Sequence, residues 1–598
     1  MADRSAPDGA TTFTVGMPAP ANHLFEIEMV VAPFSRPVRA FDLSLPAWTP
    51  GSYFIRDHAR HVRDLTAFGP GGEELASRKV EKGRWRVEAA TPVRGPFRVA
   101  YRVYAFELTV RTSHLDASHG FANGATLFFH VDGRREEPQR LKFRLPRGWK
   151  VSIALPRRKG AYEASDYDEL VDSPFECGSQ RTFSFRVRGV PHTLALWGEG
   201  NEDPQRLVRD LSRIVEAAAA LFGGLPYERY LFVVHLAEGA RGGLEHRASQ
   251  CCGVGPWAFR PESAYREVLA LFSHELFHAW NVKRIRPREL GPFDYARETY
   301  LRDLWALEGL TSYYEHLLLL RAGLAKPKHA FEAWAKDIRA HRETPGRLRQ
   351  SLEQASFDAW IRFYRPDENS PNVSESYYRR GALVALALDL VLRQETAGRR
   401  SLDDVVLGLW RRWGSRGRPY PEGAWENEAM KVGGPQLREF FDRYVRGVET
   451  PAFEELLRAA GLLLRDKPER GEGEEEGPGV APARADFGWK TKIEGGRVVV
   501  TEVYEGGAAA KAGVSARDEL VAIGGVRADE ERVKGIARDV PPGRALTLHL
   551  FRLGRLLSVT VEPGSRHSVA SEIVPDPSAG EGERTLLRAW IGAEAKTG

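Results

Sequence analysis

The first 195 or so residues alternate apolar and polar side chains over short runs, which is the pattern of half-buried strands. Residues 97–104, FRVAYRVY, are a clear example, and glycine and proline turns separate one such run from the next. No sustained helical period interrupts them. We therefore predict an N-terminal β domain over 1–195, and a β-sandwich is the simplest way to pair so many short strands.

The hydrophobic period changes from two to about 3.6 near residue 203. Asp203 precedes Pro204, as a helix N-cap precedes a proline at the first helical position. One apolar stripe then runs as far as Gly223 and Gly224, where a helix is expected to end. This segment predicts the first long helix of the chain.

A second domain, over 196–465, is predicted to be mainly helical. A buried strand is expected at 230–236, and from about 262 the apolar positions have mostly helical spacing. Ser401, followed by an acidic residue three positions later, and Thr450, followed by a proline, are expected to start helices.

The C-terminal part contains a change of composition. Residues 466–484 are rich in Gly, Pro and Glu and have almost nothing to bury, which predicts a flexible linker. Residues 485–565 form a strand-rich segment of PDZ-like size, with strands expected at 497–500 and 546–550. Residues 566–598 are interpreted as a C-terminal tail.

The charge of the chain bears on its possible partners, and its cysteine content bears on its cellular compartment. The 598 residues include 86 basic and 81 acidic side chains, for a net charge of +5, without a basic block, so no nucleic-acid partner is expected. Three cysteines without CxxC spacing cannot form a disulfide framework, which suits a reducing compartment. No run has the length of a signal peptide or a membrane span. We therefore expect a cytoplasmic protein.

The pentapeptide HELFH, residues 274–278, is the strongest chemical signal in the chain. Two histidines four apart lie on one face of a helix, so His274 and His278 can reach the same Zn²⁺ ion. Glu275 between them stays unligated and can act as a general base. The sequence therefore predicts the centre of a zinc peptidase.

A catalytic zinc site needs a third protein ligand and one open position for water. The position six residues after His278 is Arg284, so the metzincin class is excluded. Glu308 is a carboxylate in an otherwise apolar stretch, where it needs a charged partner or a metal. Glu308 is therefore the preferred third ligand, and Glu315, two turns later on the same face, is the alternative.

These motifs resemble the M61 (glycyl aminopeptidase) family of zinc metallopeptidases, gluzincins related to the M1 aminopeptidases. The resemblance rests on HELFHAWNVKRIRP, residues 274–287, and on LWALEGLTSYY, residues 304–314. Residues 45–64, LPAWTPGSYFIRDHARHVRD, resemble the family's N-terminal β domain, and the C-terminal segment resembles its PDZ domain. The resemblance implies a thermolysin-like catalytic domain and one Zn²⁺ per chain. The ligands would be His274, His278 and Glu308, with Glu275 as the base.

A second resemblance, to a short segment of the M1 aminopeptidases, implies a residue that anchors the N-terminus of the substrate. The segment Gly242-Gly243-Leu244-Glu245-His246 resembles the G-x-M-E-N segment of M1 enzymes, with Leu244 and His246 as departures. In that pattern an edge strand lines the cleft and its glutamate binds the free α-amine of the substrate. Carried over, Glu245 is the amine anchor, and Gly242 and Gly243 belong to the substrate-binding strand.

An oxyanion donor is implied by the M1-like pattern Y-x-[KR]-G, which falls on residues 378–381. A phenol hydroxyl can donate to the oxygen that gains charge in the transition state. Tyr378 is the first choice and the adjacent Tyr377 is the second. Asn281, Lys283 and Arg284 follow the second histidine closely, but the sequence assigns them no individual role.

The leading functional prediction is a zinc aminopeptidase that removes small N-terminal residues, of the Gly or Ala type by family resemblance, from peptides with a free N-terminus. The first alternative is a zinc endopeptidase whose PDZ domain helps to capture longer substrates. The second is a non-catalytic peptide-binding scaffold. In the PDZ-like segment Asp486 occupies the place of the first glycine of the carboxylate-binding loop, which disfavours capture of peptide C-termini and leaves β-augmentation as the mode of binding.

Three histidines of the β domain also lie near one another in the sequence: His114, His119 and His130. They lack ligand spacing with a recognisable partner. On the sequence alone they are interpreted as structural residues.

Overall fold

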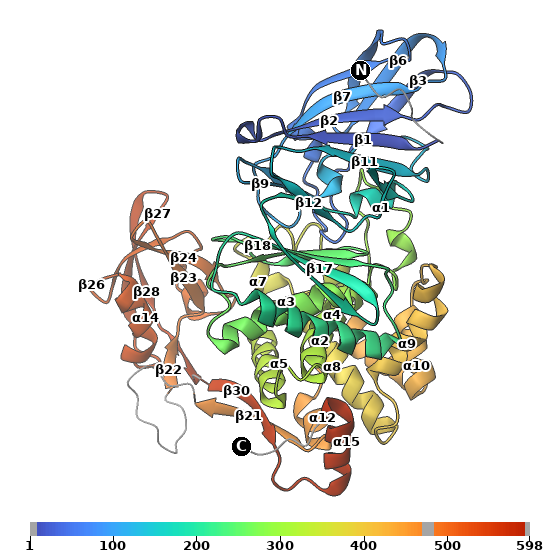
Figure 1. Cartoon of the computed structure of the whole chain (residues 1–598). Coiled ribbons are helices and arrows are strands. Elements are labelled where there is room, and N and C mark those ends of the chain that lie inside the picture. Colours follow the sequence, from blue (N-terminus) through green and yellow to red (C-terminus); the bar gives the residue numbers. More distant parts are fainter. Residues whose placement is uncertain (1–8, 469–482, 568, 593–598) are drawn as a thin grey trace. The chain divides into compact units, whose positions relative to one another are not determined.

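The computed structural model describes residues 9–468, 483–567 and 569–592 (Figure 1). The chain divides into two compact units. The first comprises Met1–Tyr300, Tyr314–Ala325 and Val406–Ala424, and the second comprises Leu301–Tyr313, Lys326–Val405 and Trp425–Gly598. The boundaries of these two units differ from those of the three domains expected from the sequence, so that division into domains stays a prediction.

The N-terminal part of the first unit is a β-sheet domain, as the alternating pattern predicts. Its described residues form an eleven-stranded sheet in which β1 pairs with β11 in parallel and the other neighbours are antiparallel. In spatial order the strands are β10 (His130–Val131), β3 (Val38–Ser44), β6 (Arg84–Val93), β5 (Glu74–Glu81), β4 (Val62–Phe68), β7 (Phe97–Tyr104), β2 (Leu24–Val31), β1 (Thr11–Gly16), β11 (Gln139–Arg144), β14 (Ala161–Ala164) and β13 (Arg157–Arg158).

A smaller sheet of four strands shares its core with the large one. Its order is β12 (Lys150–Ile153), β15 (Phe175–Gly178), β9 (His119–Ala122) and β8 (Ser113–Leu115). Phe25 of the large sheet and Phe175 of the small one belong to the same buried cluster, with ring centroids 6.0 Å apart. One short helix, α1 (Tyr167–Val171), interrupts the strands.

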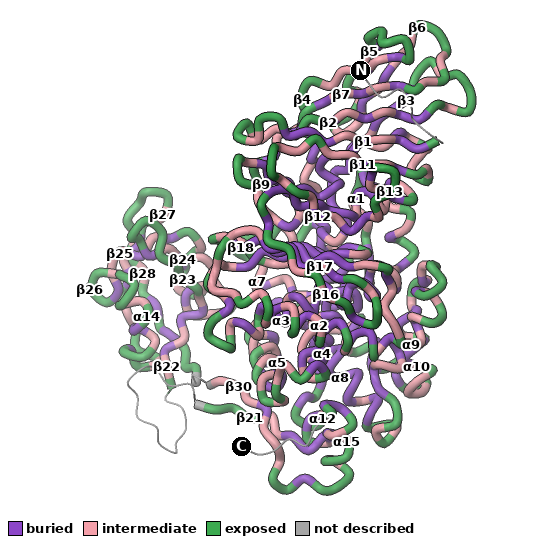
Figure 2. The backbone as a smooth tube through the Cα atoms, viewed as in Figure 1, coloured by how far each residue is buried: buried purple, intermediate pink, exposed green. Residues whose placement is uncertain are grey.

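The five-stranded sheet that follows carries part of the candidate site. Its order is β16 (Arg181–Val187), β17 (Val190–Trp197), β18 (Tyr230–Leu236), β20 (Ser249–Val254) and β19 (Gly243–Glu245). All residues of β18 and β20 are buried (Figure 2), which explains why these strands lack alternation. The predicted boundary between 195 and 196 falls inside β17, because β17 pairs with β18 of the following region.

Two long helices belong to this sheet region. The first, α2 (Pro204–Phe222), begins and ends where the sequence predicts: the Asp203 side chain accepts from two backbone amides, and Gly223 closes the helix in the left-handed conformation. The second, α3 (Glu262–Phe277), packs against α2, β19 and β20. Ten of the 16 residues of α3 are buried. Its second half is therefore enclosed on more than one side.

The second unit contains most of the remaining helices. They include the π-helical turn η5 (Trp305–Gly309), α5 (Pro327–Glu343), α6 (Leu352–Phe357), α7 (Ser370–Val373), α8 (Tyr377–Glu395), α11 (Leu437–Phe441) and α12 (Phe453–Ala459), while α4 (Leu310–Arg321), α9 (Leu402–Arg412) and α10 (Ala424–Gly433) cross unit boundaries. Ser401 precedes α9, and its amide donates to Asp404, which confirms that predicted start. The start predicted at Thr450 is wrong. The Thr450 hydroxyl bonds to His341. The helix begins at Phe453, two residues after the first position that a cap at Thr450 would give.

The C-terminal part of this unit is a separate sheet with its own core. Its strands are β23 (Trp489–Glu494), β24 (Arg497–Val503), β25 (Glu519–Ile523), β26 (Val526–Arg527), β27 (Leu546–Arg552) and β28 (Arg555–Val561), and its helices are α13 (Ala508–Lys511) and α14 (Glu530–Asp539). Val500, Leu520 and Leu548 lie at the centre of its core. Among the described residues β23 is an edge strand.

The predicted linker and tail contain regular structure at their ends. Residues 469–482 of the predicted linker lie outside the described residues. On either side of them, β21 (Leu462–Pro468) pairs with β30 (Val569–Pro575), and β22 (Ala483–Asp486) pairs with β29 (Gly564–His567). The segment interpreted as a tail also forms α15 (Glu581–Ile591), whose Trp590 is buried. These elements depend on long-range pairing, which local sequence patterns do not report.

Within the described part of the chain, no helix has both the length and the apolar character needed to cross a membrane.

Candidate active site

The two histidines of HELFH lie together at the end of α3. His274 is inside the helix, and His278 is its C-cap residue and keeps right-handed helical angles. Because the helical conformation continues through His278, the two rings stay one turn apart, with centroids 4.7 Å from each other and planes at 80°. His278 is almost fully buried and His274 nearly so. The two rings therefore lie next to each other on one face of α3, as expected for a spacing of four residues.

Each ring is oriented through its Nδ1 atom. His274 Nδ1 lies 2.8 Å from Oε2 of Glu315, and His278 Nδ1 lies 2.6 Å from the backbone carbonyl oxygen of Asn281. A carbonyl and an ionised carboxylate only accept hydrogen bonds, so in the neutral rings the proton is on Nδ1 and the lone pair is on Nε2. This is the arrangement that metal-binding histidines adopt.

Glu315 and Asn281 thus have positions that the sequence did not assign. Glu315, the alternative third ligand, bonds to the far side of the His274 ring. Asn281 contributes its backbone carbonyl rather than its side chain. The seven-residue spacing from Glu308 placed Glu315 on the correct side of its helix, but that spacing could not distinguish a ligand from a residue that orients one.

Glu308 lies in the π-helical turn η5, just before α4, and is 2% exposed. One carboxylate oxygen of Glu308 and one ring nitrogen from each of His274 and His278 lie within 4.8 Å of one another. Two imidazoles and a carboxylate are the ligand set of a catalytic zinc site. π-Helical turns are rare and occur frequently at functional sites.

Glu275 faces the backbone of the edge strand β19. A Cβ atom added at Gly243 would collide with the Glu275 carboxylate, so only glycine leaves room for it. Glu275 is 5% exposed, and a carboxylate oxygen of Glu275 lies within 4.8 Å of ligand atoms of Glu245 and His278. The predicted base and the predicted anchor are therefore neighbours. The adjacent Gly242 has a positive φ of 79° and accepts a hydrogen bond from the Gly253 amide at the turn into β19.

Glu245 is a buried carboxylate with an incomplete set of partners. It is 3% exposed, and its Oε1 atom has no hydrogen-bond partner within the described residues. Lys283 Nζ lies 3.8 Å from that oxygen, and a Cβ atom added at Gly51 would lie 2.6 Å from it. A buried anionic oxygen that lacks a hydrogen bond is costly, and a substrate ammonium group would supply one.

Lys283 is held between two acids. Its Nζ atom donates to Asp172 over 2.9 Å, and Asp172 also accepts from His246 Nδ1 at 3.1 Å. Burial alone lowers the pKa of Lys283, but Asp172 and Glu245 raise it above its usual value. Burial raises the pKa of Asp172, but Lys283 and His246 together, through their charges and hydrogen bonds, lower it below its usual value. Both groups therefore stay ionised.

A cavity of about 560 Å³ opens beside this group of charges. Its lining includes Glu245, Gly51 and Lys283, together with Tyr53 and Tyr295. Arg284, the third residue without an assigned role, instead donates to the carbonyl of Ala279 at the end of the helical segment.

Tyr378 lies near Glu308 because Gly309, next to Glu308, is in close contact with Gly381 of α8. A Cβ atom added at Gly309, next to Glu308, would lie 2.5 Å from the Cα atom of Gly381 in α8. Burial raises the pKa of the half-buried Tyr378 well above 10, and the Glu308 charge raises it further. Tyr378 thus keeps its proton and remains a hydrogen-bond donor. Tyr377 is fully buried.

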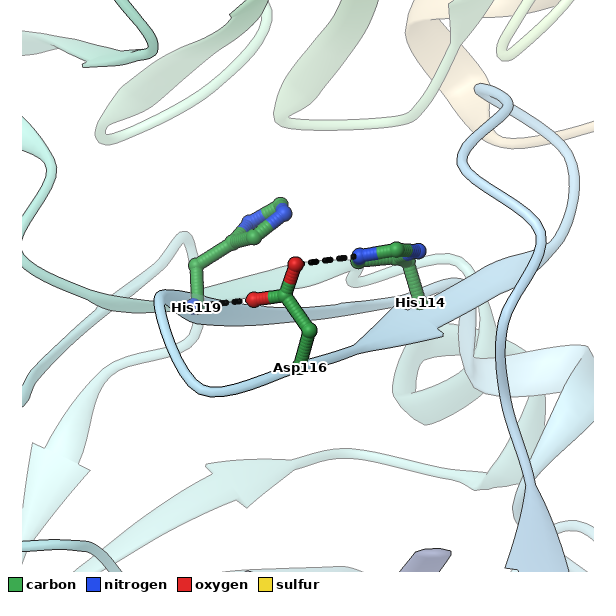
Figure 3. A group of neighbouring side chains, drawn as sticks. All are labelled: His114, Asp116 and His119. Atoms are coloured by element: carbon green, nitrogen blue, oxygen red, sulfur yellow. Dashed lines mark hydrogen bonds and ion pairs between the residues drawn. The ribbon is translucent and has the colours of Figure 1, made fainter. Parts of the chain in front are cut away.

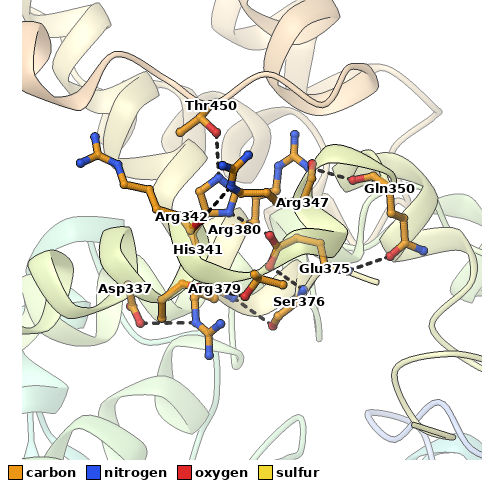
Figure 4. A network of polar contacts seen from close by, with 12 residues as sticks. Asp337, His341, Arg342, Arg347, Gln350, Glu375, Ser376, Arg379, Arg380 and Thr450 are labelled. Atoms are coloured by element: carbon orange, nitrogen blue, oxygen red, sulfur yellow. Dashed lines mark hydrogen bonds and ion pairs between the residues drawn. The ribbon is translucent and has the colours of Figure 1, made fainter. Parts of the chain in front are cut away.

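The start of α8 is fixed by a network of polar contacts (Figure 4). The Ser376 side chain caps the helix, and Glu375 accepts from His341 Nδ1 at 2.8 Å. Arg380 is 1% exposed and donates to the carbonyls of Gln350 and Gly447 at 2.8 and 2.9 Å. The arginine of the Y-x-[KR]-G pattern therefore anchors the helix, and its glycine permits the contact with η5.

Comparisons with known proteins agree with this arrangement. Residues 12–179 match the Peptidase M61 N-terminal domain, and residues 267–384 match the M61 glycyl aminopeptidase domain. The crystal structure of an aminopeptidase N family protein from Idiomarina loihiensis is 30% identical, has a TM-score of 0.89, and covers 97% of this chain and 100% of its own.

Other solved structures are more distant. An M1 zinc metallopeptidase from Deinococcus radiodurans is 15% identical with a TM-score of 0.47, and covers 74% of this chain and 94% of its own. Yeast LTA4 hydrolase is 12% identical with a TM-score of 0.44, and covers 74% of this chain and 68% of its own. No curated protein matches this chain. On the family domains and the Idiomarina relative, the chain belongs to the M61 glycyl aminopeptidase family and is a metallo-aminopeptidase of that family.

Proposed function

We propose that the protein is a zinc-dependent aminopeptidase with one catalytic Zn²⁺ per chain, held by His274, His278 and Glu308. The observation that carries the proposal is the orientation of the two rings. Both Nδ1 atoms are directed to acceptors, which turns the Nε2 side of each ring toward the group that includes Glu308. Two nitrogens and one oxygen suit Zn²⁺ and leave a fourth position for water or substrate.

When bound, Zn²⁺ supplies a Lewis acid that lowers the pKa of a water molecule and polarises the scissile carbonyl. Glu275 then takes a proton from the attacking water and returns it to the leaving amine. Its carboxylate faces the backbone of β19 at Gly243, where an extended peptide can lie beside an edge strand. Tyr378 keeps its proton and donates to the carbonyl oxygen as negative charge develops there.

Glu245 makes the enzyme an exopeptidase in this proposal. Its Oε1 atom is buried and lacks a hydrogen bond from any described residue, and an α-ammonium group supplies both the proton and the opposite charge. Lys283 and Asp172 keep the neighbouring charges fixed. A longer chain on the N-terminal side of the scissile residue would occupy the same space.

A preference for N-terminal glycine or alanine follows from the family resemblance alone. The cavity beside Glu245 has a volume of about 560 Å³, which does not by itself exclude larger side chains. Turnover of a series of dipeptides that differ only in the first residue tests this preference. A rate that falls steadily from Gly to Phe supports it, and equal rates contradict it.

The amine-anchor proposal is tested with one peptide in free and N-acetylated forms. We expect cleavage of the free peptide only, and Glu245→Gln should remove that discrimination. Equal cleavage of both forms by the wild type would instead favour an endopeptidase. A chain that binds peptides without cleaving either form, even with Zn²⁺ added, would be a scaffold.

The C-terminal sheet is proposed to be a PDZ-like peptide-binding module that adds a strand at β23. The Asp486 side chain already accepts from the Gly488 amide at 3.0 Å, in the loop that would otherwise bind a carboxylate. Capture of a peptide C-terminus is therefore disfavoured, whereas the edge of β23 can pair with an extended chain. Binding that is equal for peptides with a free and an amidated C-terminus would support this mode.

A further inference from the structure

A second cluster of metal-binding side chains lies on the hairpin that joins β8 to β9. His114 and His119 stand on either side of the turn, and one oxygen of Asp116 lies between their rings (Figure 3). His114 Nε2 is 3.2 Å from Oδ2 of Asp116. One ligand atom from each of these three residues lies within 4.8 Å of the others.

His119 is held firmly and has one unused nitrogen. Its Nδ1 atom donates to Oε1 of Glu176 over 2.8 Å, and its ring stacks on Trp197 with centroids 3.6 Å apart. Because Nδ1 carries the proton, the lone pair is on Nε2. The His119 side chain is fully buried, and its Nε2 atom has no hydrogen-bond partner among the described residues.

Glu176 completes a carboxylate–histidine pair of the kind found behind metal ligands. It is fully buried, and its second oxygen accepts from His235 Nε2 at 2.9 Å. Both oxygens of Glu176 are therefore held by histidine side chains, and Oε1 lies directly behind the His119 ring.

The charge balance of the cluster favours a cation. Asp116 and Glu176 bring two negative charges, and their ion-pair partners among the described residues are histidines only. A divalent ion would compensate both charges and use the buried lone pair of His119.

We propose that His114, Asp116 and His119 form a second metal site, selective for a divalent first-row ion such as Zn²⁺ and separate from the catalytic ion. Two imidazoles and one carboxylate suit Zn²⁺ and leave one position for water. The 3.2 Å between His114 Nε2 and Asp116 Oδ2 matches the roughly 3.3 Å edge of a tetrahedron with metal–ligand bonds of about 2.0–2.1 Å. The ion would fasten the hairpin, through Glu176 and His235, to β15 and β18.

The test counts ions in the full-length chain after chelation and dialysis against Zn²⁺. We expect two Zn²⁺ per wild-type chain. The double variant His274→Ala/His278→Ala removes the proposed catalytic ligands and should keep one ion. In that background Co²⁺ should also give visible absorption bands of a site with nitrogen and oxygen ligands. A double variant that binds no ion overturns the proposal.

Asp116→Asn and His114→Gln should each reduce the wild-type stoichiometry from two ions to one. Asp116→Asn keeps an oxygen that can accept from the Ser118 and His119 amides, as Oδ1 of Asp116 does, so the turn should survive. The matched control is Asp576→Asn, because Asp576 accepts from Ser578 N and Oγ in the same way but has no histidine partner among the residues that the structure describes. Two ions retained in both hairpin variants would overturn the site.

The result is independent of the proposed peptidase chemistry. Loss of the second ion with normal turnover separates this site from the catalytic one. Conversely, the wild type could lack peptidase activity while the His274→Ala/His278→Ala variant still binds one ion. That result would support the hairpin site and disprove only the proposed function.

Discussion

The chain contains two histidine pairs with a similar arrangement. One pair, His274 and His278, lies on α3, and the other, His114 and His119, lies on the β8–β9 hairpin. In each, one ring donates from Nδ1 to a carboxylate over 2.8 Å: His274 to Glu315, and His119 to Glu176. The ring centroids are 4.7 Å apart on the helix and 5.0 Å apart on the hairpin. Similar geometry therefore does not require similar sequence spacing.

The difference lies in what brings the parts together. On α3 the spacing of four residues alone aligns the rings. On the hairpin, His119 meets Glu176 because β9 pairs antiparallel with β15, and His235 joins them from β18 of another sheet. A site built by a helix can be recognised from a pentapeptide, whereas a site built by strand pairing is dispersed along the chain.

The largest expected difference between the two pairs is in turnover. Glu275→Gln should lower kcat/KM towards the upper end of the 10²–10⁴-fold range expected for a general base, with metal content unchanged. Asp116→Asn in the hairpin should leave kcat/KM within about twofold, because it touches no reacting atom in this account. Steady-state kinetics with one free dipeptide measures both. Unchanged turnover in Glu275→Gln would exclude the proposed base.

Tyr378 should come next in effect. Tyr378→Phe removes the donor to the developing oxyanion, so kcat should fall by about 10²–10³-fold while KM changes little. Tyr377→Phe is the matched control, because Tyr377 adjoins Tyr378 with ring centroids 4.8 Å apart. A larger loss in Tyr377→Phe than in Tyr378→Phe would reverse the assignment of the two tyrosines.

Gly243→Ala tests the contact between β19 and the base. The added methyl group collides with the carboxyl group and the Cγ atom of Glu275, so this flexible side chain has to move aside. The free energy of unfolding should therefore change by only about 1 kcal/mol, whereas kcat should fall by about tenfold to a hundredfold through displacement of the base. Gly255→Ala is the control, because nothing lies within 4 Å of its added Cβ atom. Normal turnover in Gly243→Ala would show that the base does not depend on this contact.

The smallest effects should come from the two carboxylates that orient the rings. Glu315→Gln should weaken Zn²⁺ binding at the α3 pair by about 10–100-fold, and Glu176→Gln should do the same at the hairpin. Each substitution should leave the other site unchanged, which competition with a zinc-binding dye resolves. If Glu176→Gln has no effect on either ion, the carboxylate–histidine interpretation of the hairpin is wrong.

Much of the site could be predicted because it depends on local periodicity. The spacing of His274 and His278 requires only a helix, and the match of Pro204–Phe222 to its predicted limits shows how reliable caps and glycines are here. Glu308 could be proposed because a carboxylate in an apolar run needs a partner. The family motifs added the anchor and the tyrosine.

The parts of the fold and of the site that the sequence did not predict depend on contacts between segments that are distant in the sequence. The approach of Gly309 to Gly381, which brings Tyr378 to Glu308, joins two helical elements that no local pattern relates. The failed helix start at Thr450 has the same cause, since its hydroxyl is bonded to His341. The boundary expected at 195 stays a prediction, although residue 195 lies within β17, which pairs with a strand more than 30 residues later.

The most direct test of the account is anomalous diffraction at the zinc absorption edge from crystals of the wild-type protein. We expect a peak about 2.0–2.1 Å from the Nε2 atoms of His274 and His278 and about 2.0–2.2 Å from a Glu308 oxygen. No peak at that position, or a peak that Glu308 does not reach, would contradict the proposed catalytic centre.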